Sequence, residues 1–110
     1  MIPAVFAKQK NMDKLIITVK EIKGKCPVYD TGDTIVLDEG YRLNLHETDH
    51  VCMHSLCAIM PYYIALFRGI EPKHLGLCRD GQKAYVQCLD PCEYTGGGTV
   101  IFEIEKKTNT

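Results

Sequence analysis

The residues best suited to chemistry in this chain are its six cysteines and four histidines. Two of each type lie in the stretch His50–Cys57, which has the sequence HVCMHSLC. Thiolate and imidazole are the ligands that zinc prefers, and a thiolate is also a nucleophile. The stretch therefore raises three alternatives, namely a metal site, a redox site, or cysteines that fill a hydrophobic core.

Helical geometry separates these four side chains. At about 100° per residue, Cys52 falls on the apolar stripe of the predicted helix, whereas His50, His54 and Cys57 fall on another face. A single four-ligand site is therefore excluded while the segment is helical. His50 and His54 have the i, i+4 spacing of a zinc-binding pair, so His54 is a candidate ligand, although surface histidines are the commoner occurrence of this spacing.

A second set of candidates combines distant cysteines. Cys26 precedes Pro27 after the first predicted strand, Cys88 lies just before Asp90 after the third, and Cys52 lies near the helix start. Strand ends and a helix start meet at one edge of many α+β domains, so we expect Cys26, Cys52 and Cys88 to converge. Three thiolates favour zinc, an iron–sulfur cluster or copper(I). The alternative is that all three simply fill the core, as free cysteines often do.

Three other residues are candidates for a site. Asp33 and Asp90 are carboxylates in predicted turns, where Asp33 is expected to bond to the backbone of its own turn, with a catalytic role as the alternative. Arg68 falls on the same helical face as His50 and His54 if the helix continues that far.

The elements that must position these residues follow from hydrophobic periodicity. A helix is expected to begin at Thr48 or Asp49, either of which can cap it, and to reach Phe67, with a kink or break at Pro61. The predicted strands are 14–22, 34–37, 84–89 and 99–105. We therefore predict an α+β fold in which a mostly antiparallel four-stranded sheet, in ββαββ order, packs against one long helix interrupted by proline.

The chain is predicted to be one domain of residues 13–106. Residues 1–12 form an N-terminal appendage and residues 107–110 a solvated tail, and Met12 is an alternative translation start to Met1. A sheet of this kind has free edges, so pairing into a homodimer is expected to be available.

Composition excludes some classes of partner. The 110 residues carry 13 basic and 14 acidic side chains, a net charge of −1, and the two signs are mixed along the chain. This balance argues against nucleic acid and against an anionic membrane surface. The sequence has no apolar run of membrane-spanning length and no secretory signal pattern, so we expect a cytoplasmic protein with reduced thiols.

Several stretches, GKCPVYDTGD, AIMPYYIALFRG and AYVQCLDP, resemble a family of short bacterial and archaeal domains of uncharacterised function that are sometimes tandemly repeated. The resemblance covers about 15–105. It implies no activity. It does imply that Cys57, Cys78 and Cys92 are particular to this member. The residues that match the family pattern are Cys26, Pro27, Gly32, Asp33, Cys52, Pro61, Arg68, Cys88, Asp90 and Pro91.

Three hypotheses for function follow. The first is a small cytosolic binding domain with a thiolate metal or metal-cluster site of Cys26, Cys52 and Cys88, completed by a nearby histidine or cysteine. The second is a non-catalytic protein-interaction module with structural cysteines. The third is a thiol-based redox domain or enzyme with Cys52 as nucleophile and Asp90 or a histidine nearby. Binding ranks above catalysis, because no base, nucleophile and oxyanion donor occur together in the sequence.

Overall fold

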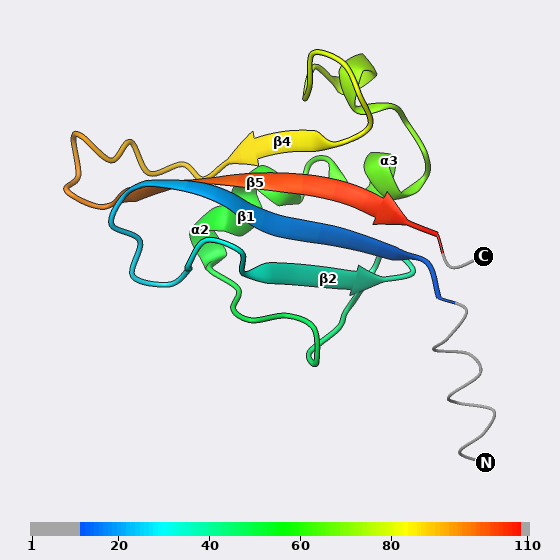
Figure 1. Cartoon of the computed structure of the whole chain (residues 1–110), viewed down its shortest axis with the longest axis horizontal. Helices are drawn as coiled ribbons and strands as arrows, with labels where there is room; N and C mark the ends of the chain where they lie inside the picture. The colour runs from blue at the N-terminus through cyan, green and yellow to red at the C-terminus, as the bar shows by residue number, and fades with distance from the viewer. Residues whose placement is uncertain (1–11, 109–110) are drawn as a thin grey trace.

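One antiparallel sheet, with strand order β3-β2-β1-β5-β4, carries the fold in the computed structural model, which describes residues 12–108 (Figure 1). The strands are β1 (Lys14–Gly24), β2 (Thr34–Asp38), β3 (Arg42–Leu43), β4 (Ala84–Gln87) and β5 (Gly98–Lys107). The helical elements are α2 (Met53–Ile59), α3 (Tyr63–Phe67) and the short 3-10 helix η1 (Pro72–Leu75).

The long strands β1 and β5 form the centre of the sheet. They pair along their whole length, from Lys14 opposite Lys107 to Gly24 opposite Gly98, with one irregularity between Val19 and Glu21. Alternate side chains point to opposite faces of a strand, so every second residue faces the helices. On β1 these inward residues are Leu15, Ile17 and Val19, and on β5 they are Val100, Phe102 and Ile104; all six are buried.

The helices lie against one face of this sheet (Figure 1). Ile59 of α2 and Leu66 of α3 join the inward side chains of β1 and β5 in one hydrophobic core. The ring of Tyr29 meets that of Phe102 edge-on, with the centroids 5.5 Å apart. This packing stabilises both the sheet and the loop between β1 and β2.

The predicted number of strands and the predicted long helix were wrong. The sheet has five strands because the segment that follows β2, which we expected to be irregular, turns back and adds β3, with Arg42 opposite Asp38 and Leu43 opposite Leu37. The helices are short. The α+β class and the mostly antiparallel pairing agree with the prediction.

The helix begins later than predicted because its expected caps are used elsewhere. The hydroxyl of Thr48 accepts a hydrogen bond from the Val36 amide, and the carboxylate of Asp49 accepts one from the Thr34 amide. Both side chains therefore bond to the outer edge of β2. The first helical residue is Met53, after Cys52 in an extended conformation.

The break at Pro61 was predicted correctly. Helix α2 ends at Ile59, and α3 begins at Tyr63 after a turn that contains the proline. Proline has no amide hydrogen to continue the helical ladder, which accounts for the interruption at this point.

The ends of the chain extend beyond the described residues. Most of the predicted N-terminal appendage, residues 1–11, and residues 109–110 of the predicted tail lie outside the described range. Strand β5 continues as far as Lys107. Within residues 12–108, the helices are all too short or too polar for one of them to cross a lipid bilayer.

Candidate functional site

A closed set of hydrogen bonds around the buried side chain of Tyr29 joins the β1–β2 loop to the start of α2. The Cys52 amide donates to the Tyr29 hydroxyl at 2.8 Å, and this hydroxyl lies 2.8 Å from Ser55 Oγ. Ser55 donates its one proton to the Cys52 carbonyl at 2.6 Å. Tyr29 must therefore be the donor to Ser55, and all three groups are satisfied.

Cys26 is placed beside this network by its own backbone turn. Its Sγ accepts hydrogen bonds from the amides of Val28 and Tyr29, each at 3.4 Å. Cys26 and Cys52 are both partly buried and pack against the hydrophobic core. Two of the three predicted cysteines thus adjoin the same tyrosine.

Cys88 has a different environment. Its side chain is buried in the core, and its thiol donates to the Gly98 carbonyl at 3.6 Å. Among residues 12–108, no three histidine, cysteine, aspartate or glutamate side chains are arranged to hold a metal ion. All six cysteines lie in this range and all are free thiols. The three-thiolate metal site stays a prediction.

The predicted histidine face is open to solvent. His50 precedes the first residue of α2, so it does not share a helical face with His54, and both side chains are exposed. Arg68 is also exposed and follows α3 as its C-terminal cap. The structure therefore does not bring these three residues together on one helix.

The two turn carboxylates bond to their own loops. Asp33 accepts a hydrogen bond from the Asp30 amide at 2.9 Å, which confirms the predicted role of Asp33. Asp90 accepts hydrogen bonds from the Cys92 amide and the Thr95 hydroxyl. Both carboxylates therefore stabilise turns.

An apolar hollow lies between α2 and the β1–β2–β3 half of the sheet, and we call it the apolar cleft. Its volume is about 190 Å³. Tyr41 and Met60 line it although 73% and 57% of their respective surfaces are exposed, so the apolar cleft opens to solvent. The described residues that line it are Ile17, Ile35, Leu37, Tyr41, Leu43, Val51, Leu56, Ile59, Met60 and Tyr63.

A second hollow continues the apolar cleft along α3. Tyr41 and Tyr63 line both hollows. The rest of the second hollow's lining is mixed in character and consists of Glu39, Gly40, Ile64, Phe67 and Arg68. Ile64 is 58% exposed. Tyr41, Met60 and Ile64 are exposed apolar side chains around these two hollows. Exposed apolar patches in proteins commonly mark interaction sites.

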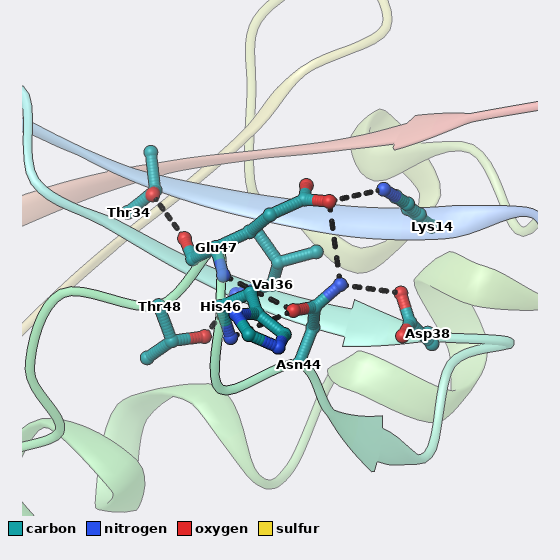
Figure 2. A network of polar contacts seen from close by, with 8 residues as sticks. All are labelled: Lys14, Thr34, Val36, Asp38, Asn44, His46, Glu47 and Thr48. Atoms are coloured by element: carbon teal, nitrogen blue, oxygen red, sulfur yellow. Dashed lines mark hydrogen bonds and ion pairs between the residues drawn. The ribbon is translucent and has the colours of Figure 1, made fainter. Parts of the chain in front are cut away.

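A polar network fixes the segment that follows β3 (Figure 2). Asn44 follows β3, and its side-chain amide donates to Asp38 at 3.2 Å and to Glu47 at 3.3 Å. Glu47 pairs with Lys14 of β1 at 2.6 Å. Because Asn44 is fixed in this way, β3 and its cleft-lining Leu43 have a defined position.

The same segment closes the outer edge of β2. The amides and carbonyls of Thr34 and Val36 that point away from β1 bond to Asp49, Thr48 and Asn44. An edge whose hydrogen-bonding groups are already used cannot template a further strand. The homodimer expected from a free edge therefore stays a prediction, and the β2 edge does not support it.

The opposite face of the sheet carries a charged cluster around Glu103 of β5. The Tyr85 hydroxyl donates to the Glu103 carboxylate at 2.8 Å, and Lys20 and Lys83 lie 3.6 and 3.5 Å from the same carboxylate. The hydrogen bond raises the pKa of Tyr85 and, with support from the two lysines, lowers the pKa of Glu103. This cluster stabilises the exposed face at the β4 side.

Sequence reasoning missed Ser55 and the apolar cleft. A serine between Cys52 and Ile59 on the inner side of the helix is a signal for a buried polar partner, and Tyr29 is that partner. Tyr41, Leu43 and Leu45 alternate in YRLNL, which is the pattern of a strand. Only the position of α2 shows that Tyr41 and Leu43 border a hollow.

The Tyr29 network makes a prediction for stability at alkaline pH. Burial raises the pKa of Tyr29 above its usual value. The neutral hydroxyl stabilises the fold fully while the pH is below about 10, the pKa of tyrosine in the unfolded chain. This stabilisation is lost as the pH rises through the higher pKa of Tyr29 in the folded protein. The wild type is therefore expected to lose its stability advantage over Tyr29→Phe above about pH 10. Urea unfolding of both proteins under reducing conditions measures this difference, and a constant difference across the alkaline range would refute the role of the hydroxyl.

Comparisons of the chain with protein-family models, with curated proteins and with solved structures give no significant match. The resemblance to the family of short bacterial and archaeal domains therefore stays a prediction.

Proposed function

We propose that this chain is a non-catalytic interaction module whose apolar cleft binds a short apolar peptide segment of a protein partner. The observation that carries the proposal is that the described lining of the cleft consists of apolar and aromatic side chains, while Tyr41 and Met60 remain largely exposed. Exposed aromatic and methionine side chains at a hollow are enriched in protein interfaces.

The size of the cleft favours side chains over a whole small molecule. Its volume of about 190 Å³ is below the roughly 300–1,000 Å³ of typical ligand pockets. One or two anchoring side chains of a peptide suit this volume, and the adjoining hollow along α3 would accommodate the next residues of the same segment. Tyr41 and Tyr63 would contact both parts of the peptide.

The chemistry of the lining supports binding over catalysis. Hydrocarbon groups, the Met60 thioether and two phenols supply apolar contact and hydroxyl hydrogen bonds. Methionine adapts to differently shaped partners because its side chain is unbranched and flexible. The Asn44–Glu47 network holds the β3 side of the cleft in place, which lowers the cost of ordering it on binding.

The proposal predicts selective loss of peptide binding at Tyr41. Short peptides selected from a random displayed library on the wild-type protein are expected to contain spaced apolar anchors. Their affinity, measured by calorimetry, should fall about 10- to 100-fold in Tyr41→Ser, the range that truncation of an interface anchor produces.

A matched control is available in the same chain. Tyr94 is 89% exposed and lies in the loop before β5, so Tyr94→Ser should bind the selected peptides as the wild type does. Met60→Ser and Met53→Ser form a second pair, because both methionines are exposed but only Met60 lines the cleft. Peptides that bind every variant equally, or no selected peptide at all, would contradict the proposal.

A further inference from the structure

We propose that a second cavity, at the end of the sheet where β1 begins and β5 ends, binds a short-chain carboxylic acid as its carboxylate anion. We call it the Lys106 cavity. It is separate from the apolar cleft and goes beyond the proposed function, because no residue within 12–108 lines both.

The Lys106 cavity lies between the last residues of β5 and the segment that follows α3 (Figure 1). Strand β4 starts only at Ala84, opposite Ile104, so the residues before it leave the edge of β5. Its volume is about 310 Å³, within the roughly 300–1,000 Å³ of typical ligand pockets. The Lys106 cavity therefore has room for a small molecule.

Buried hydrocarbon side chains line the inner part of the cavity. Leu15 of β1, Leu66 of α3 and Ile104 of β5 are at most 6% exposed, and all three line it. Ile70 also lines the cavity and is 46% exposed, so the apolar wall continues toward solvent. The part of a ligand that enters most deeply must therefore be apolar.

Lys106 supplies the ammonium group of the described lining. Side chains alternate along β5, so Lys106 shares the inward face of Ile104. Its Nζ lies 4.5 Å from the centroid of the Phe67 ring, and it has no carboxylate partner in the part of the chain that the structure describes. A cation–π contact at a partly exposed ring is weak, so this ammonium can turn from Phe67 to a carboxylate in the cavity.

The two carboxylates of the lining do not oppose an anion at Lys106. The Glu71 carboxylate lies 3.8 Å from Lys73 Nζ, within its own turn. Neighbouring residues of a strand point to opposite faces, so the Glu105 carboxylate lies on the face of the sheet away from Lys106. The charge left for a ligand is therefore positive, and a carboxylate joined to a short hydrocarbon group matches both this charge and the apolar inner wall.

Isovalerate is the probe for the site, because it joins a carboxylate to an isobutyl group. In the whole chain with ¹³C-labelled leucine and isoleucine methyl groups, it is expected to shift the Leu66 and Ile104 signals, with a dissociation constant of about 0.1–1 mM for a ligand of this size. The signals of Ile35 and Leu43, which line the apolar cleft, should stay in place. Shifts at the cleft alone would overturn the assignment.

Two changes test the charge. Lys106→Met keeps an unbranched side chain but removes the ammonium, and it should weaken isovalerate binding about tenfold. Lys107→Met is the matched control, because Lys107 is exposed and is not among the lining residues. Isovaleramide, a neutral analogue of the same shape, should bind the wild type about tenfold more weakly than isovalerate. Equal binding of the acid and the amide would overturn recognition of a carboxylate.

Free leucine distinguishes an acid from an amino acid as the source of the carboxylate. It has the same isobutyl group and a carboxylate, but its ammonium would lie close to that of Lys106, so it should bind more weakly than isovalerate. Tighter binding of leucine would overturn the acid in favour of an amino acid. Isovalerate that shifts none of the cavity signals at about 10 mM would overturn the proposal and would leave the proposed function of the cleft standing.

Discussion

Replacement of Tyr29 by alanine is expected to lower the free energy of unfolding by about 3–5 kcal/mol, the range found for truncation of buried aromatic residues. The Tyr29 side chain is 3% exposed and packs against the ring of Phe102. Its removal leaves a cavity under the β1–β2 loop and leaves the Cys52 amide without its acceptor. Since small domains have only about 5–15 kcal/mol of stability, this change would remove a large share of it.

Tyr29→Phe separates the ring from the hydroxyl. It keeps the contact with Phe102 but leaves two groups, the Cys52 amide and the Ser55 hydroxyl, with one partner fewer, at an expected cost of about 1–3 kcal/mol. Chemical denaturation measures both variants, with Tyr94→Ala as a control that should stay within about 0.5 kcal/mol of the wild type. Equal losses for Tyr29→Phe and Tyr94→Ala would show that the hydrogen-bonded network contributes nothing.

The second large effect is expected at Gly24, where β1 ends. Its φ of +78° favours glycine, and a β-carbon there would lie 2.4 Å from both Cys92 Sγ and the Gly97 carbonyl oxygen. That oxygen accepts the Lys25 amide at 3.1 Å, so the backbone cannot move aside without straining this bond. Gly24→Ala is therefore expected to destabilise the protein by about 3 kcal/mol or more.

Gly96 provides a matched comparison for Gly24. Its φ is +75°, and nothing lies within 4 Å of the position that a β-carbon would take. Gly96→Ala therefore carries only the backbone penalty of about 1–2 kcal/mol. Thermal unfolding of the two variants isolates the cost of the steric contact, and similar melting temperatures would contradict the close approach of β1 and the 92–97 loop.

The Tyr29 network also bears on the apolar cleft. It fixes the start of α2, and this helix contributes Leu56 and Ile59 to the cleft lining. Loss of the network would therefore loosen one wall of the cleft, whereas the Asn44–Glu47 network holds the β3 side. The two polar networks thus secure opposite parts of a hydrophobic site.

The sequence alone determined the features that depend on neighbouring residues. Alternation of apolar and polar residues identified the strands that begin near Lys14, Thr34, Ala84 and Thr99, because a strand places every second side chain on the same face. Pro61 identified the interruption between the helices because it lacks an amide hydrogen. The carboxylate of Asp33 was assigned correctly to its turn because its partner, the Asp30 amide, is three residues away.

Features that depend on distant segments were decided by the tertiary structure. Thr48 and Asp49 have the chemistry of helix caps, but the edge of β2 lies close enough to take their side chains, so the helix begins at Met53. Cys26 and Cys52 adjoin Tyr29, whereas Cys88 donates to Gly98 within the core. The apolar cleft likewise exists only because α2 is placed across β1–β3. Local patterns fix which face a side chain occupies, but the order of strands in the sheet fixes which faces meet.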